Sequence, residues 1–236
     1  MRGWWQEITG LVLPVDCAGC GRPRTELCER CQRLLGGAAS ARRVRPAPEP
    51  HGLPPVWAAG RYGDEVRAVV LAHKERGALG LARPLGTALA GAVRRMGAPG
   101  PVLLVPVPSA RRAVAQRGHD ATARMARAAS LELRRYGMAA RAAGALRLLR
   151  PVADQTALGG AGRLANLSGA MSVAAGGTGR LLRTAPVILV DDLMTTGSSL
   201  TVAAQAVAVA GGRVVGAAVV AGPRDPEVHP DAHRSR

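Results

Sequence analysis

Apolar runs and amphipathic stretches alternate over residues 56–222 of this chain. The apolar runs are too short for helices and are typical of buried strands; they cover 56–62, 101–108, 187–190 and 214–220. Helical patterns follow them over about 64–73, 78–96, 120–136 and 200–210, and we expect Asp64 to cap the first helix. Strands that alternate with helices predict an α/β domain in which helices flank a parallel sheet.

Composition divides the chain into four predicted parts. Residues 1–37 hold all the cysteines, and the Pro- and Arg-rich residues 38–55 are expected to form an extended, stiff linker. The α/β domain would occupy 56–222, with 151–180 irregular, and the polar residues 223–236 are expected to be a disordered tail. No secretory signal or transmembrane segment is predicted, because charged residues or Gly pairs interrupt every apolar stretch, and a cytoplasmic location is therefore expected.

The charge balance indicates a class of partner, which the hydropathy pattern does not. The formal net charge is +16, only 2% of the residues are aromatic, and Lys74 is the only lysine. Such a basic chain favours polyanionic partners, which are nucleic acid, phosphorylated small molecules or anionic lipid. The alternative is an arginine-rich surface that is merely solvated, and the scarcity of aromatic rings argues against a stacking platform for single strands.

A strand, two acids and a loop of small hydroxyl residues follow one another near the C-terminus. The strand 187–190 leads into Asp191 and Asp192, and the loop that opens the next helix contains Thr195, Thr196, Gly197, Ser198 and Ser199. The N–H groups of such a loop and of the helix N-terminus bind anions. The acids would face sugar hydroxyls or a metal, so a ribose 5-phosphate site is predicted. A plain helix N-cap is the alternative, but it needs one hydroxyl or acid rather than this series.

This segment resembles the 5-phosphoribosyl-1-pyrophosphate (PRPP) motif of type I phosphoribosyltransferases. The motif has four apolar residues, two acids, two variable residues, Thr-Thr-Gly and a small hydroxyl residue, and residues 187–198 fill every position. The resemblance implies a type I phosphoribosyltransferase-like sheet, PRPP with Mg²⁺ as ligand, and Asp191 and Asp192 as catalytic residues. A basic loop after strand 101–108 would then hold the pyrophosphate through Arg111, Arg112 and Arg117, since ligands lie outside the carboxyl ends of strands.

The cysteines form two Cys-x-x-Cys pairs close together in the chain. Their members are Cys17 and Cys20, then Cys28 and Cys31. This spacing predicts a tetrahedral zinc site, and four protein ligands leave no open position, so the metal would be structural. Disulfides or free thiols are the alternatives, and disulfides are disfavoured in the cytosol.

A four-cysteine knuckle, a linker and a phosphoribosyltransferase-like domain, in this order, resemble the ComF family of competence-associated proteins. Weaker similarities are the segments His73–Gly77, Val107-Pro108 and Arg117-Gly118, and a series of Gln155, Leu158, Arg163 and Asn166. One departure is His119-Asp120-Ala121, where many members have an aromatic residue, Asn and Gln. The resemblance implies a cytoplasmic role in DNA uptake and natural transformation, where single-stranded DNA meets a helicase and recombination proteins.

Three functions therefore stay open, and the sequence leaves undecided whether the chain is an enzyme. The first is a PRPP-binding accessory of DNA uptake that binds single-stranded DNA. The second is a phosphoribosyltransferase of nucleotide salvage, and the third is a PRPP-sensing regulator. The candidate DNA contacts of the first are arginines around the knuckle and in the linker, namely Arg22, Arg24, Arg30, Arg33, Arg42, Arg43 and Arg45.

Overall fold

The computed structural model describes residues 16–98, 100–149, 170–174 and 176–223. The predicted tail beyond residue 223, most of the segment predicted to be irregular, and the Gln155 to Asn166 series lie outside the described residues. Among the described residues, no helix combines the length and the apolar character needed to cross a membrane.

A six-stranded sheet with the order β1-β2-β8-β7-β3-β4 forms the centre of the described chain. Its strands are β1 (Arg42–Val44), β2 (Val56–Arg61), β3 (Val102–Pro106), β4 (Ala140–Ala142), β7 (Val187–Leu193) and β8 (Val214–Gly222). All neighbours pair in parallel except β1, which runs antiparallel to β2 at one edge. The predicted α/β fold with a mostly parallel sheet is confirmed.

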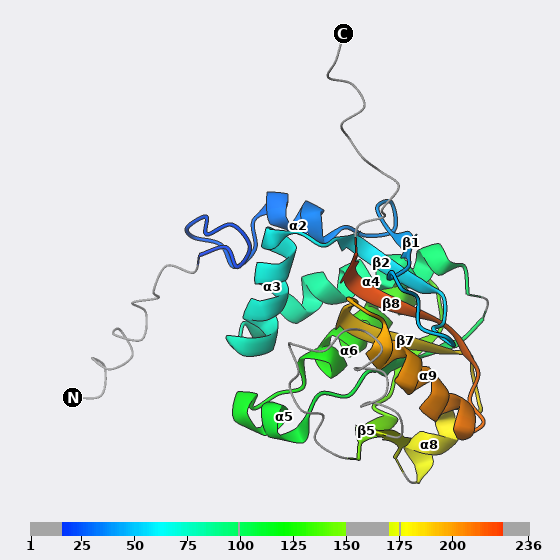
Figure 1. The fold of residues 1–236 in the computed structure, drawn as a ribbon. Coiled ribbons are helices and arrows are strands. Elements are labelled where there is room, and N and C mark those ends of the chain that lie inside the picture. Colours follow the sequence, from blue (N-terminus) through cyan, green and yellow to red (C-terminus); the bar gives the residue numbers. More distant parts are fainter. Residues whose placement is uncertain (1–15, 99, 150–169, 175, 224–236) are drawn as a thin grey trace.

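Helices cover both faces of this sheet (Figure 1). One face carries α3 (Asp64–Glu75), α4 (Ala82–Met96) and α6 (Ala121–Arg135), which share a core cluster with Ile188 and Val190 of β7. The other face carries α9 (Ser198–Val209), which packs on Val187 and Leu189 of the same strand. Alternate residues of β7 therefore point to opposite layers, as the pleat of a strand requires.

The remaining elements are short and lie around these layers. They are α2 (Glu29–Leu35), the 3₁₀ turn η1 (Leu79–Leu81), α5 (Arg111–Arg117), α8 (Gly177–Leu181), and the antiparallel pair β5 (Leu146–Leu148) and β6 (Met171–Val173).

Small residues let the helices approach closely in a chain that has no phenylalanine. A Cβ atom added at Gly86 of α4 would collide with Ala128 and the backbone of Ala129 on α6. The core is otherwise built from Ala, Val and Leu, as the composition predicts. Close backbone contact between α4 and α6 thus replaces the bulk that aromatic side chains supply in other cores.

Four local predictions need correction. The segment predicted to be an extended linker contains the edge strand β1, whose Arg42 donates hydrogen bonds to Gly60 O and Pro223 O. The predicted basic loop is the helix α5, because Arg, Ala and Gln favour helices, and Gly118 ends it with a φ of 72°. Within the segment predicted to be irregular, residues 171–173 form β6 and 177–181 form α8. Asp64 does not cap α3: Gly63 is the N-cap, and Asp64 begins the helix.

The cysteine segment packs directly on the α/β layers. The carbonyl oxygens of Leu34 and Leu35 lie so close to Gly60 of β2 that a Cβ there would approach each within 2.9 Å. Leu35 is fully buried in the same core cluster as α3 and α4, and Arg30 forms an ion pair with Glu65 of α3 at 2.8 Å. Residues 16–37 are therefore held by the sheet and by α3.

Candidate functional site

The two predicted acids lie within β7, which continues past the apolar run to Leu193. Asp191 accepts a hydrogen bond from the N–H of Asp192 through Oδ1 at 2.8 Å. Asp192 accepts one from the N–H of Leu193, also at 2.8 Å. Each carboxylate is thus fixed by the backbone of the next residue, and the dyad sits at the carboxyl end of a central strand, where parallel sheets place their ligands.

Lys74, at the end of α3, forms an ion pair with one member of this dyad. Its Nζ lies 2.6 Å from Oδ2 of Asp192, and the two side chains are 33% and 8% exposed respectively. Burial disfavours the ammonium form, but the Asp192 carboxylate outweighs it and raises the pKa of Lys74 above its usual value. Sequence reasoning did not assign Lys74 to the site. The signals were that Lys74 is a single lysine in an arginine-rich chain and that it lies in the segment His73–Gly77, which is similar to the ComF family.

Asp191 has a different electrostatic environment from Asp192. The residue as a whole is partly exposed, but its carboxyl group is buried among protein atoms. Burial, followed by repulsion from the Asp192 carboxylate, raises its pKa well above the usual value, and Lys74 opposes this only in part. The dyad therefore offers one carboxylate held by a cation and one carboxyl group that takes up a proton more readily.

The predicted phosphate loop connects β7 to α9. Its first residue is tied to β8 by a hydrogen bond from Met194 N to Ala221 O at 3.0 Å. Gly197 then adopts a left-handed φ of 76°, and the 12-residue helix α9 begins at Ser198. Thr201 closes the first turn by donating from Oγ1 to Gly197 O at 3.1 Å. Glycine is needed at position 197 for this left-handed conformation; a Cβ there would also meet the end of the Leu53 side chain at 2.9 Å, which can move aside.

The backbone N–H groups of this loop are free to bind a ligand. Within the described residues, no protein acceptor is recorded for the N–H groups of Thr195–Ser199. The hydroxyls of Thr196 and Ser198 lie 3.1 Å apart and add further donors. N–H groups at a helix N-terminus that have no acceptor in the described part of the chain are typical of anion sites, and this loop is where the sequence predicts the phosphate.

The three predicted pyrophosphate-binding arginines are placed differently. Arg111 and Arg112 are exposed at the start of α5, and no ion pair is recorded for them among the described residues. Arg117 has a side chain only 9% exposed and forms an ion pair with Glu75 at 3.0 Å. It also donates to the carbonyl of Lys74 at 3.3 Å. Arg117 therefore reaches the dyad only through Lys74.

His119, where the chain departs from the ComF pattern, also contacts the end of α3. Its Nε2 lies 3.0 Å from His73 O, and its Nδ1 lies 3.0 Å from Arg117 O. Together with Arg117, it gives partners to the last carbonyl groups of α3, which a helix leaves unpaired. The junction between α5 and α6 thus fixes the backbone from which Lys74 extends.

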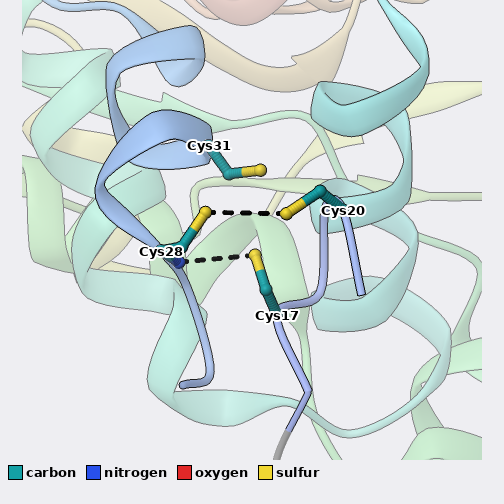
Figure 2. Close-up of side chains that lie close together, drawn as sticks. All are labelled: Cys17, Cys20, Cys28 and Cys31. Carbon is teal, nitrogen blue, oxygen red and sulfur yellow. Dashed lines mark hydrogen bonds between the residues drawn. The ribbon is translucent and has the colours of Figure 1, made fainter. Parts of the chain in front are cut away.

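The cysteine cluster shown in Figure 2 is a candidate metal centre. The Sγ atoms of Cys17, Cys20, Cys28 and Cys31 all lie within 4.8 Å of one another. The pair Cys20 and Cys28 is separated by 3.6 Å. Thiolates that bind zinc tetrahedrally at about 2.3 Å lie about 3.8 Å apart, so these sulfurs could hold a zinc ion.

The surroundings of the sulfurs favour deprotonation at two of them: the pKa of Cys28 is lowered, chiefly by the backbone N–H of Cys31, and that of Cys17 is lowered as well. Burial opposes the thiolate of Cys17, but backbone N–H groups led by that of Cys28 outweigh burial and lower its pKa to about 6. The Cys28 N–H lies 3.3 Å from this sulfur. At Cys31, burial and the neighbouring sulfurs raise the pKa instead. All four can be thiolates together only with a cation among them.

The predicted DNA-contacting arginines fall into two groups. The first has protein partners: Arg30 pairs with Glu65, Arg33 with Glu29 and Arg45 with Glu49, and Arg42 binds backbone carbonyls. The second group is Arg22, Arg24 and Arg43, for which the described part of the chain records no ion pair.

A family model described as "Phosphoribosyl transferase domain" matches residues 164–236. The matched stretch contains the dyad, the Thr195–Ser199 loop, and the strands and helix that position them. No curated protein matches the chain. The α/β fold and the carboxylate dyad at a strand end agree with this similarity of residues 164–236 to a phosphoribosyl transferase domain. A four-cysteine cluster compatible with zinc precedes the matched stretch.

Proposed function

We propose that this chain binds PRPP together with Mg²⁺ at the carboxyl end of β7. The 5′-phosphate would bind the N–H groups of Thr195–Ser199, and the ribose hydroxyls would bind Asp191 and Asp192. The exposed Arg111 and Arg112 would approach the pyrophosphate. The observation that carries this proposal is the row of loop N–H groups without protein acceptors, directly after a fixed pair of acids.

The chain's own residues would orient and polarise the bound ribose. Asp192 would accept a hydrogen bond from a ribose hydroxyl, and Asp191, whose pKa is raised by burial, would accept or donate one. A Mg²⁺ ion bound with PRPP would neutralise charge on the pyrophosphate as it leaves C1. Transfer would form a bond from an acceptor nitrogen to C1 and release pyrophosphate; binding without transfer would make the chain a PRPP-sensing regulator.

Isothermal calorimetry with PRPP and Mg²⁺ tests the proposal. We expect the double variant Asp191→Asn, Asp192→Asn to bind PRPP at least about tenfold more weakly, because the double variant lacks the hydrogen bonds to charged groups. The control is Glu29→Gln, a fully exposed acid on α2. Equal affinity in wild type and double variant would refute the assignment. Pyrophosphate release, with and without nucleobases or DNA, then separates transferase from sensor.

DNA uptake is the second candidate function, with single-stranded DNA as the partner and a helicase or recombination proteins nearby. The observation that favours it is the net charge of +16, together with Arg22, Arg24 and Arg43, which form no ion pair with any residue that the structure describes. The cysteine cluster would bind zinc and fix the loop that carries Arg22 and Arg24, whereas Arg43 lies on the edge strand β1. This role would place the chain in the cytoplasm, whereas nucleotide salvage has the proposed ribose-phosphate site and the family match in its favour.

A further inference from the structure

Lys74, the single lysine of the chain, is held at the proposed ribose-phosphate site by an ion pair. Lys74 Nζ lies 2.6 Å from Asp192 Oδ2. An ammonium group has three N–H donors, and among the described residues Asp192 is the only acceptor recorded for them. The side chain is 33% exposed, so a ligand can reach part of it.

The backbone of Lys74 is held firmly. Arg117 donates to its carbonyl at 3.3 Å, and a ring nitrogen of His119 lies 3.0 Å from the carbonyl of His73. Arg117 is itself fixed by Glu75. The ammonium is thus directed at the dyad by an anchored helix end rather than by a free surface side chain.

The ammonium and the phosphate loop approach the dyad from opposite faces of the sheet. Lys74 extends from α3, whose Val69 and Val70 belong to one core layer. The loop opens into α9, whose Val202 and Val207 belong to the other layer. In a 5-phosphoribosyl ligand the 5′-phosphate and the C1 substituent likewise lie at opposite ends of the ribose. A ligand with its phosphate in the loop therefore directs C1 away from the loop.

From this arrangement we infer that Lys74 selects ligands with an anionic group at C1, so that PRPP binds in preference to ribose 5-phosphate. The inference rests on the proposed ribose-phosphate site. In the free protein the ammonium neutralises Asp192. In the complex the ribose hydroxyls bind the dyad, and the ammonium binds the phosphate oxygens attached to C1. Coulomb attraction at a partly buried site makes this contact stronger than one in open water.

Comparing two ligands in calorimetry tests the inference. We expect Lys74→Gln to weaken PRPP binding at least about tenfold, but to change ribose 5-phosphate binding less than about threefold. Lys74→Arg retains the positive charge and should restore part of the preference. The matched control is Arg76→Gln, which removes a positive charge from an exposed residue next to the same helix end. It should leave both affinities unchanged.

A second measurement uses the unmodified sequence. Reductive methylation with ¹³C-formaldehyde labels only Lys74 and the N-terminal amine and keeps their charge. Both ligands bring ribose hydroxyls to Asp192, but only PRPP brings phosphate oxygens to the ammonium, so PRPP should shift the Lys74 resonance clearly more than ribose 5-phosphate does. Equal shifts, or an equal loss of both affinities in Lys74→Gln, would show that Lys74 is only the counter-ion of Asp192 and would overturn the inference. If the wild type binds neither ligand, the proposed function fails, and the inference fails with it.

Discussion

At the residue scale, the two acids of the dyad are expected to affect stability in opposite directions. The pKa of Asp191 is raised by burial and by Asp192, so the ionised carboxylate of Asp191 destabilises the folded state at neutral pH. Asp191→Asn should raise the free energy of unfolding by about 0.5–1 kcal/mol, as replacements at functional sites often do. Asp192→Asn removes the carboxylate that pairs with Lys74 and should lower the free energy of unfolding by about 1 kcal/mol.

Urea unfolding at several pH values checks both signs. A group whose pKa is raised in the folded state loses its stabilising contribution as pH rises through the folded value. The advantage of Asp191→Asn over wild type should therefore be present at pH 7 and vanish as pH falls toward about 4, the usual pKa of aspartate. An Asp191→Asn protein less stable than wild type at pH 7 would contradict the assigned environment.

Contiguous site residues were predictable from the sequence, and long-range partners were not. The dyad, its loop and the cysteines could be identified because each group occupies a short segment with a characteristic spacing. Lys74 and Asp192 are 118 positions apart, and no local pattern relates them. The same holds for Arg117, whose expected ligand contact is replaced by Glu75 and the end of α3.

At the scale of elements, the central strands and long helices agree closely with the hydropathy pattern because each has a buried face. The 3.6-residue period of α4 and α6 and the apolar run of β7 are unambiguous signals. β1 and α5 were missed for a physical reason. β1 has only three residues and is stabilised by pairing with β2, while α5 has no buried residue to produce a period.

At the scale of the whole molecule, the cysteine cluster is part of the packing of the α/β domain. The Cys31 side chain and Val69 of α3 both lie close to Gly19, where an added Cβ would be 2.7 Å from Cys31 Sγ and 3.2 Å from Val69. Arg30 and Leu35 add an ion pair and buried apolar surface to the same contact. Loss of the cluster should therefore weaken α3 and the sheet, not only residues 16–37.

Metal removal tests this dependence. We expect about one zinc per chain by elemental analysis, and Cys31→Ser or chelation should lower the Tm of the whole domain by at least about 5 °C in far-UV circular dichroism. Arg22→Ser, an exposed change in the same loop, should leave the Tm within about 1 °C of wild type. A metal-free protein with an unchanged Tm would show that the cluster is only a surface feature.

The charge of the whole molecule permits a test of nucleic-acid binding with two matched sets of substitutions. One set changes Arg22, Arg24 and Arg43 to Gln, and the other changes Arg30, Arg33 and Arg45, which pair with acids. Both sets remove the same number of positive charges. If the unpaired arginines bind phosphates, only the first set should weaken binding of an oligo-dT strand strongly in fluorescence anisotropy.

The salt dependence distinguishes direct phosphate binding from general attraction. Each arginine that no longer neutralises a phosphate should reduce the slope of log affinity against log salt by about 0.7, because fewer counterions are released from the strand. The first set should thus lower the slope by about 2, and the second set by much less. Equal effects of both sets would mean that only net charge matters. A slope near zero in the wild type would leave the +16 charge as a solvated surface and exclude DNA as a partner.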